Sequence, residues 1–186
     1  MQNELQNAIK ALKEGGLILY PTDTTWGIGC DASNAEAVKK IYKLKQREDR
    51  KALTCLVADD RMLKKYIKQI PFAAQNIIDV TDKPTTIIYD EAKNLAANLI
   101  GKDGSIGIRI PDDEFCYWLS RKFNGAIVST SANISGQPYP KSYKEIAVEV
   151  IKGVDYVVNL HKEKICAKPS SIIKLTNSGI VKIIRT

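Results

Sequence analysis

The sequence predicts an α/β protein built on one twisted sheet of mixed parallel and antiparallel strands with flanking helices. Short apolar strands alternate with amphipathic helices over most of the chain, which favours parallel pairing. The chain ends in an expected hairpin, which is antiparallel. No repeat or low-complexity tract interrupts the 186 residues, so we expect a single domain over residues 1–186.

The first half of the chain alternates helix and strand. Leu5, Ala8 and Leu12 recur at helical spacing before Gly15. A capping box at Ser33–Glu36 is expected to open the second helix. The other elements predicted in this half are a strand at 17–20, a loop at 21–27, a strand at 53–58, helices that begin at Asp60 and Pro71, and a strand at 85–89.

In the second half, residues 105–110 alternate, with three isoleucines on one face and Ser105 and Arg109 on the other. A helix from about Asp112 is expected to bury Phe115, Trp118 and Leu119, and a capping box at Ser142–Glu145 to start the last helix. The remaining predicted strands lie at 126–130, 154–158, 171–175 and 180–184, with a turn at Asn177–Gly179 between the last two.

Composition narrows the class of protein. An apolar fraction of 44% and a charged fraction of 26% are typical of globular proteins. No apolar run approaches the roughly 18 residues of a membrane span, and the amino terminus does not resemble a signal peptide. Four scattered cysteines argue against a zinc site or a disulfide framework, so we expect a cytoplasmic protein. The net charge of +7 fits either solvated helix faces or a phosphate-rich partner.

Four segments carry polar residues that the fold does not require. Hydroxyls in the loop 22–25 suit an anion or an amino acid. Positively charged residues are concentrated at 43–51. Their number exceeds what the dipole at a helix C-terminus favours, which indicates a polyphosphate partner. A run of hydroxyls and amides follows the strand at 126–130, and Ser105 with Arg109 shares one strand face. Each segment alone could be an ordinary polar surface.

Familiar catalytic sets are absent from the sequence. It contains one histidine, no phosphate-binding GxxxxGK[ST] loop, no GxGxxG fingerprint and no GxSxG elbow. With no nucleophile set, the chemistry should rest on positioning and electrostatic stabilisation, which is what phosphoryl-group chemistry requires.

The ordered blocks of these segments resemble the YrdC family of threonylcarbamoyl-AMP synthases. The resemblance runs from about residue 9 to the end and implies one YrdC-like catalytic domain with a positively charged cavity. The blocks that carry it are Pro21–Gly27, Lys45–Arg47, Ser105–Pro111, Ser129–Pro138 and Ser170–Ile173.

The resemblance also implies roles for individual residues. Lys45 and Arg47 would be catalytic and would hold the ATP phosphates. The further ATP-binding positions would be Lys51, Ser105, Ser131, Asn133 and Arg185, and the threonine-binding positions Thr24, Arg109, Ser129 and Ser170. No protein metal site is implied, and Mg²⁺ would accompany ATP.

The implied reaction joins L-threonine, bicarbonate and ATP into threonylcarbamoyl-AMP, which passes to a tRNA-modification complex. Two other functions stay open: an RNA-binding module, with weak tRNA binding possible, and a paralogue acting on another small acid. Some positions depart from the family pattern, which bears on loop geometry and threonine contacts. These are Trp26 for a usual tyrosine, Glu48 and Ala52 for prolines, Leu56 for a histidine of longer relatives, and Asp82–Thr86 for a Pro-Gly-Pro-like segment.

Overall fold

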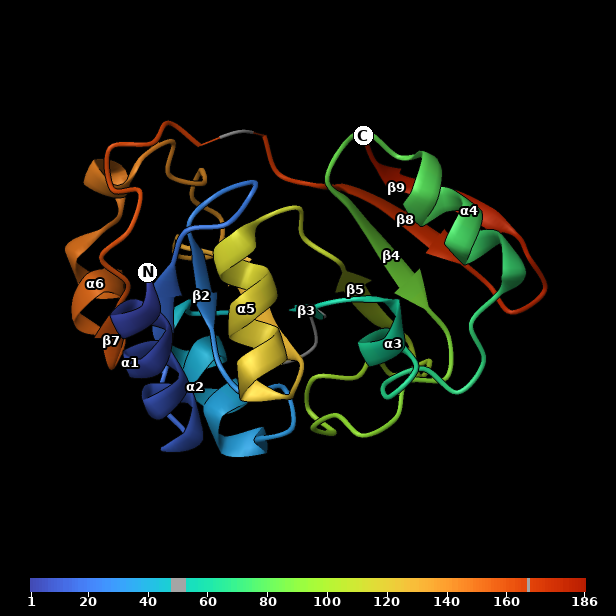
Figure 1. The fold of residues 1–186 in the computed structure, drawn as a ribbon, viewed down its shortest axis with the longest axis horizontal. Coiled ribbons are helices and arrows are strands. Elements are labelled where there is room, and N and C mark those ends of the chain that lie inside the picture. Colours follow the sequence, from blue (N-terminus) through green and yellow to red (C-terminus); the bar gives the residue numbers. More distant parts are fainter. Residues whose placement is uncertain (48–52, 167) are drawn as a thin grey trace.

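In the part of the chain that the structure describes, a nine-stranded mixed sheet runs through the protein, and helices cover it (Figure 1). The computed structural model describes residues 1–47, 53–166 and 168–186. The strand order is β7-β1-β2-β6-β3-β5-β4-β8-β9. The strands are β1 (Ile18–Tyr20), β2 (Gly27–Gly29), β3 (Thr54–Leu56), β4 (Thr85–Tyr89), β5 (Ile106–Arg109), β6 (Ile127–Ser131), β7 (Tyr156–Val157), β8 (Ser171–Leu175) and β9 (Val181–Arg185).

Both kinds of strand pairing occur, so the predicted fold class is confirmed. β1 pairs with β7, β3 with β5, and β4 with β8 in parallel, whereas the other neighbouring pairs are antiparallel. β8 and β9 form the expected hairpin, with Leu175 opposite Val181. Because β5 lies between β3 and β4, its side chains are buried on both faces.

The helices pack at the two ends of the sheet. Helices α1, α2, α5 and α6 gather beside β1, β2 and β7, and α3 and α4 lie beside β4 and β8 (Figure 1). Among the described residues, no helix is long and apolar enough to cross a membrane. The helices are α1 (Gln2–Lys13), α2 (Ala35–Leu44), α3 (Asp60–Leu63), α4 (Phe72–Val80), α5 (Glu114–Phe123) and α6 (Val148–Lys152), with a 3₁₀ turn at Tyr143–Glu145.

Two predicted capping boxes are wrong. The cap of α2 is Asn34, whose side chain accepts hydrogen bonds from the amides of Glu36 and Ala37, while the Ser33 hydroxyl donates to Asp31. Ser142 starts only the 3₁₀ turn and makes no side-chain cap, and the last helix begins at Val148. In the second case, Glu145 accepts instead from the backbone amide of Lys141.

Strand β2 was not predicted, because its two glycines have low strand propensity. The packing explains one of them: a Cβ atom at Gly29 would lie 2.8 Å from the Tyr20 ring and from the Val128 carbonyl. The prediction that Trp118 is buried is also wrong, since it is 39% exposed, whereas Phe115 and Leu119 of the same helix are buried.

Candidate active site

A polar cavity of about 360 Å³ lies where the loop 22–25, the end of β6 and the start of β8 meet. It brings together eight of the residues that the sequence singled out. Of those eight, three are arginines and five carry hydroxyl or amide groups. They are Thr24, Arg47, Arg109, Ser129, Ser131, Asn133, Ser170 and Arg185.

The charged side chains in the described lining are all positive. The described lining residues include three arginines and no carboxylate, and the ion pair of Arg109 is with Asp23, which does not line this cavity. Burial lowers the pKa of the Arg47 guanidinium, so its charge is poorly hydrated. An anionic ligand would compensate that lost hydration, and a guanidinium matches phosphate oxygens in a bidentate geometry. The cavity is therefore suited to a polyanion.

The turn after β6 is held by its own side chains. The Ser131 hydroxyl donates to Asn133 Oδ1 at 2.5 Å, and Asn133 Nδ2 donates to the Gln137 carbonyl at 2.6 Å. Gly27 on the neighbouring strand leaves room beside it, because a Cβ there would lie 3.2 Å from Ser129 Oγ. These hydrogen bonds fix the Ser131 hydroxyl and the Asn133 amide at the cavity.

Lys45 lies beneath the cavity and does not line it. The side chain is 1% exposed at the C-cap of α2, and its Nζ donates to the carbonyl of Ser131, to the carbonyl of Asn133 at 2.6 Å and to Asn133 Oδ1 at 3.2 Å. In the structure Lys45 thus contacts the turn, and its contact with ATP phosphates stays a prediction. Burial and the nearby Arg47 charge lower the pKa of Lys45 to about 7.

Arg109 is buried and paired within the protein. A strand arginine is usually exposed, but Arg109 is 5% exposed because β5 is an interior strand. Its guanidinium forms an ion pair with Asp23 and lies 3.4 Å from Thr24 Oγ1. The Thr22 hydroxyl accepts from the Thr24 amide at 3.1 Å and donates to the Thr25 carbonyl at 2.7 Å, which shapes this loop.

The C-terminal hairpin supplies the opposite wall. Arg185 donates from Nε and Nη2 to the Ser170 carbonyl, at 3.0 and 2.7 Å. The Ser170 hydroxyl shares a hydrogen bond of 2.8 Å with Thr86 Oγ1. Ser170 directly precedes β8. Its carbonyl is held by Arg185 of β9, and its hydroxyl is held by Thr86 of β4.

Besides Lys45, two predicted site residues do not belong to the described lining. Lys51 falls outside the described residues. Ser105 does not belong to the described lining; its hydroxyl donates to Asp103 Oδ1 at 2.6 Å, and Lys174 binds the same carboxyl group. These hydrogen bonds, Lys174 foremost, hold the pKa of Asp103 well below its usual range. Ser105 thus has a structural partner at the far end of the strand from Arg109.

Sequence reasoning missed several cavity residues. Thr86 lines the cavity and is 2% exposed. A hydroxyl side chain within an otherwise apolar strand was the sequence signal that could have identified it. Asp23 had been counted only as part of a polar loop, although a buried arginine requires a counter-charge. The other missed lining residues are Leu53, Thr54, Tyr139 and Pro169, whereas the remaining lining residues lie within the segments that the sequence had marked.

The fold and this site define a nucleotide-handling α/β protein of a known family. The family model described as Sua5/YciO/YrdC, telomere recombination, matches residues 10–186, so the chain belongs to that family. It is 31% identical over 185 residues to a threonylcarbamoyl-AMP synthase of Idiomarina loihiensis, with 98% of each chain covered.

Two solved structures are similar over nearly the whole chain. One is P. abyssi Sua5 in complex with L-threonine, at 26% identity and a TM-score of 0.86; the match covers 94% of this chain and 52% of that one. The other is E. coli YciO, at 25% identity and a TM-score of 0.86, with 100% and 89% covered. The chain therefore spans about half the length of the P. abyssi protein.

Proposed function

We propose that this chain is an L-threonylcarbamoyladenylate synthase. It would convert L-threonine, bicarbonate and ATP into threonylcarbamoyl-AMP and pyrophosphate, for the N6-threonylcarbamoyladenosine modification of tRNA. The observation that carries the proposal is the cavity itself, in which three arginines and a wall of hydroxyls face one another without a carboxylate among the described lining residues. That lining complements a triphosphate and a small amino acid together.

The proposed reaction has two steps. The threonine amine first adds to bicarbonate and water leaves, which gives a carbamate. A carbamate oxygen then attacks the α-phosphorus of ATP, so that a new O–P bond forms while the bond to the β-phosphate bridging oxygen breaks. The electron pair of that bond leaves with pyrophosphate. The protein contributes alignment of the two reactants and stabilisation of the charge that develops on phosphate oxygens.

The cavity geometry supports a division of roles. Arg47 is proposed to hold the phosphates, with Ser131, Asn133 and Arg185 on the nucleotide side. Arg109 and Thr24 are proposed to bind the threonine carboxylate, with Ser129 and Ser170 nearby. Lys45 becomes a positioning residue for the turn 131–133, Lys51 stays a predicted phosphate contact, and Ser105 is left out of the proposed site.

ATP is proposed to enter as its Mg²⁺ complex. The lining offers hydroxyl and amide oxygens, and the described residues contain no group of three acidic, histidine or cysteine ligands. Mg²⁺ that arrives bound to phosphates needs few protein ligands, so this donor set fits it. We further propose that residues 1–186 form one catalytic domain. Because the product serves tRNA modification, we place the enzyme in the cytoplasm and expect it to hand that product to a modification complex.

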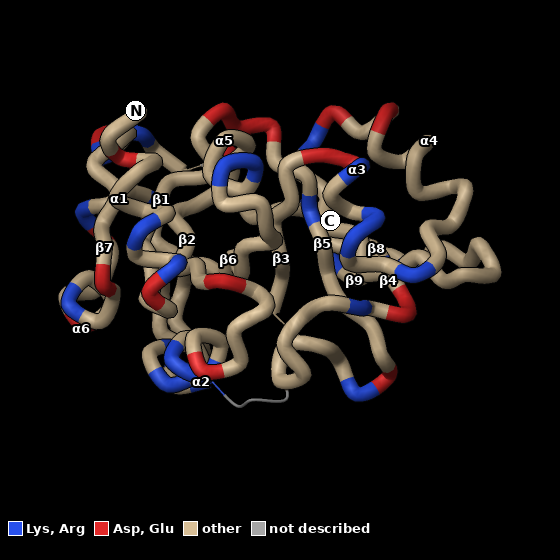
Figure 2. Tube along the Cα trace, turned by 60° about the horizontal axis from the view of Figure 1, so that its bottom comes forward, with Lys and Arg blue, Asp and Glu red and all other residues tan. Residues whose placement is uncertain are grey.

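Direct RNA binding receives less support from the charge distribution. Lys and Arg are scattered over most elements and are interspersed with Asp and Glu (Figure 2). A backbone-binding RNA module needs cations gathered along one face. The net charge of +7 is thus spread over many elements.

Release of pyrophosphate should require all three substrates. Purified protein with Mg·ATP is expected to release pyrophosphate only when both threonine and bicarbonate are present, because the attacking carbamate forms from those two. The measurement is coupled pyrophosphate detection with each substrate omitted in turn, and with serine in place of threonine. Release that persists without threonine or bicarbonate contradicts the proposal, and a preference for serine favours a paralogue with another small acid.

Variants of the Asp23–Arg109 pair should distinguish a loss of threonine binding from a loss of stability. Replacing Arg109 alone would leave a carboxylate that is 8% exposed without a counter-charge. The double variant Asp23→Asn/Arg109→Ala avoids that penalty, and its threonine affinity is expected to fall roughly 10- to 100-fold from the loss of a charged hydrogen bond. Asp23→Asn alone should bind threonine at least as well as the wild type, since Arg109 loses a competing carboxylate.

Threonine and ATP affinities of both variants can be measured by calorimetry. ATP affinity should change little in either. If the double variant loses ATP affinity instead, Arg109 belongs to the nucleotide site.

A further inference from the structure

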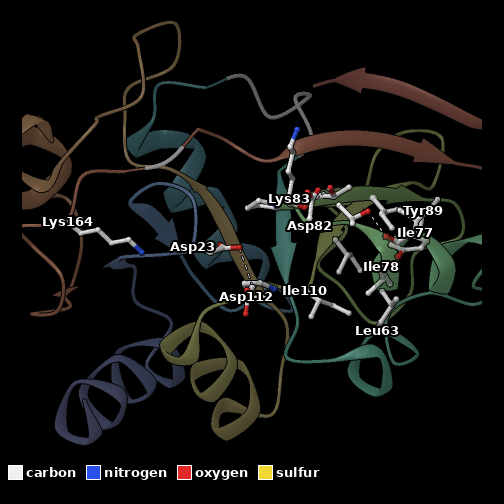
Figure 3. A pocket seen from close by; sticks show the side chains of 16 residues that line it. Asp23, Leu63, Ile77, Ile78, Asp82, Lys83, Tyr89, Ile110, Asp112 and Lys164 are labelled. Carbon is white, nitrogen blue, oxygen red and sulfur yellow. Dashed lines mark hydrogen bonds between the residues drawn. The ribbon is translucent and has the colours of Figure 1, made fainter.

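A second cavity, of about 580 Å³, is shown in Figure 3. It lies on the opposite face of β4 and β5 from the candidate active site. Alternate residues of the same strands line the two cavities: Ile87 and Ile108 face this one, whereas Thr86 and Arg109 face the other. Its volume is within the range of about 300–1,000 Å³ that is usual for small-molecule sites. The proposed reaction does not use it.

The two ends of this cavity differ in chemistry. Leu63 of α3, Ile77 and Ile78 of α4, and Tyr89 of β4 gather at one end (Figure 3). Burial raises the pKa of the Tyr89 phenol, so these four side chains carry no charge. An apolar chain or ring would replace water there at a gain in free energy.

Asp23 and Asp112 lie together at the other end (Figure 3). The Asp112 amide donates to Asp23 Oδ2 at 3.3 Å, which brings the two residues together, and no ion pair of the Asp112 carboxylate occurs among the described residues. Lys164 also borders this end but forms no ion pair there within the described chain. Asp82 and Lys83 on the rim have opposite charges. Because Asp23 is paired with Arg109, the carboxylate at this end that could accept a cation without displacing a partner is that of Asp112.

Asp23 connects the two cavities. Its carboxylate lines the second cavity and forms the buried ion pair with Arg109, which lines the first. A cationic group placed at Asp23 would compete with Arg109 for this carboxylate. Occupation of one cavity would thus change the charge environment of the other, which is the requirement for energetic coupling between two sites.

We propose that the second cavity binds a small amphipathic cation, an apolar chain or ring that carries a primary amine. Its ammonium lies at Asp23 and Asp112, and its apolar part packs against Ile77, Ile78 and Tyr89. Binding lowers the threonine concentration needed for half-maximal activity, because it frees Arg109. The binding itself is independent of the proposed synthase activity, whereas the coupling rests on it.

The binding test uses three probes with the same skeleton: 4-phenylbutylamine, 4-phenylbutanol and 4-phenylbutyrate. Their affinities for the full chain are measured by calorimetry without ATP or threonine. The amine is expected to bind about tenfold more tightly than the carboxylate, with the alcohol between them. A carboxylate that binds as tightly as the amine, or the lack of saturable binding by all three at millimolar concentrations, overturns the proposal.

Variants locate the site. Ile78→Trp fills the apolar end from a half-buried position and should abolish amine binding; Thr81→Trp serves as a second filling variant if the first does not fold. Asp112→Asn should weaken amine binding roughly two- to fivefold, the usual worth of an exposed ion pair, and leave the alcohol unaffected. Asp79→Asn, an exposed aspartate of α4 outside the lining, is the matched control and should change neither.

Amine binding that survives both filling variants places the ligand elsewhere and overturns the assignment. For the coupling, 4-phenylbutylamine should lower the half-saturating threonine concentration of the wild type but not of Ile78→Trp. An unchanged threonine dependence in an active enzyme that binds the amine overturns the coupling. A chain that binds the amine but releases no pyrophosphate contradicts the proposed function and supports the second site.

Discussion

Arg47→Lys should reduce threonine-dependent pyrophosphate release about 10²- to 10³-fold, which is the usual cost of removing one preorganised donor to developing charge. Arg47 lines the candidate active site, and lysine keeps its positive charge. Lysine is a point charge, however, and cannot reproduce the planar fork that a guanidinium offers to two phosphate oxygens. The expected loss therefore reports geometry and not net charge.

Lys43 supplies a matched control for this experiment. It is exposed in the last turn of α2, so Lys43→Arg makes the reverse exchange four residues before Arg47, at a position that does not line the cavity. Turnover should stay at the wild-type level in that variant. RNA binding measured in parallel should be unchanged in both, because counterion release depends on the number of charges. If Arg47→Lys keeps the wild-type turnover, then Arg47 does not contact the reacting phosphates and its proposed role is wrong.

The fold was predictable where sequence patterns coincide with packing. The strand at 85–89 and the final hairpin were predicted within a residue or two, since β-branched runs and an Asn-Ser-Gly turn leave few alternatives. β2 was missed because close approach of Tyr20 selects a glycine that has low strand propensity. The predicted capping box of α2 was wrong because neighbouring polar groups compete for the same hydrogen bonds. The Asn34 side chain caps the helix, and the Ser33 hydroxyl donates to Asp31 instead.

The candidate site was predictable as a set of residues but not as a set of contacts. Motif order placed Ser129, Ser131 and Arg109 in one site, and the structure brings them to one cavity. The partner of each residue depends on which strands become neighbours. Arg109 meets Asp23 from 86 positions away, and Lys45 meets Asn133 from 88 positions away. Neither distance along the chain carries a local signal, so these two contacts could not be predicted from the sequence.

Replacing Lys45 by methionine should lower both stability and turnover. Methionine keeps the unbranched shape of the side chain but removes the donor, which leaves the Ser131 and Asn133 carbonyls without their Nζ partner. Each buried acceptor left unsatisfied costs about 1–3 kcal/mol, so the free energy of unfolding should fall by about 2–6 kcal/mol. The freed turn would shift Ser131 and Asn133, and a misplacement near 1 Å costs about 10²-fold in turnover.

The stability difference should also depend on pH. The pKa of Lys45 is about 7 in the fold, against 10.5 for the ordinary side chain. Between these values the unfolded chain holds a proton that the folded chain has lost, so the wild type gains stability as pH rises, at up to about 1.4 kcal/mol per pH unit. Below pH 7 both states are protonated, and this gain is absent.

Lys45→Met lacks this titration, so its stability deficit against the wild type should grow from pH 7 to pH 9. Urea unfolding of both proteins at several pH values measures this, with the exposed Lys43→Met as the control for general effects of losing a lysine. A deficit that stays constant with pH would show that Lys45 keeps its proton in the fold. Its three acceptors would then hold it as a permanent ammonium, and the turn 131–133 would be fixed by charge at every pH tested.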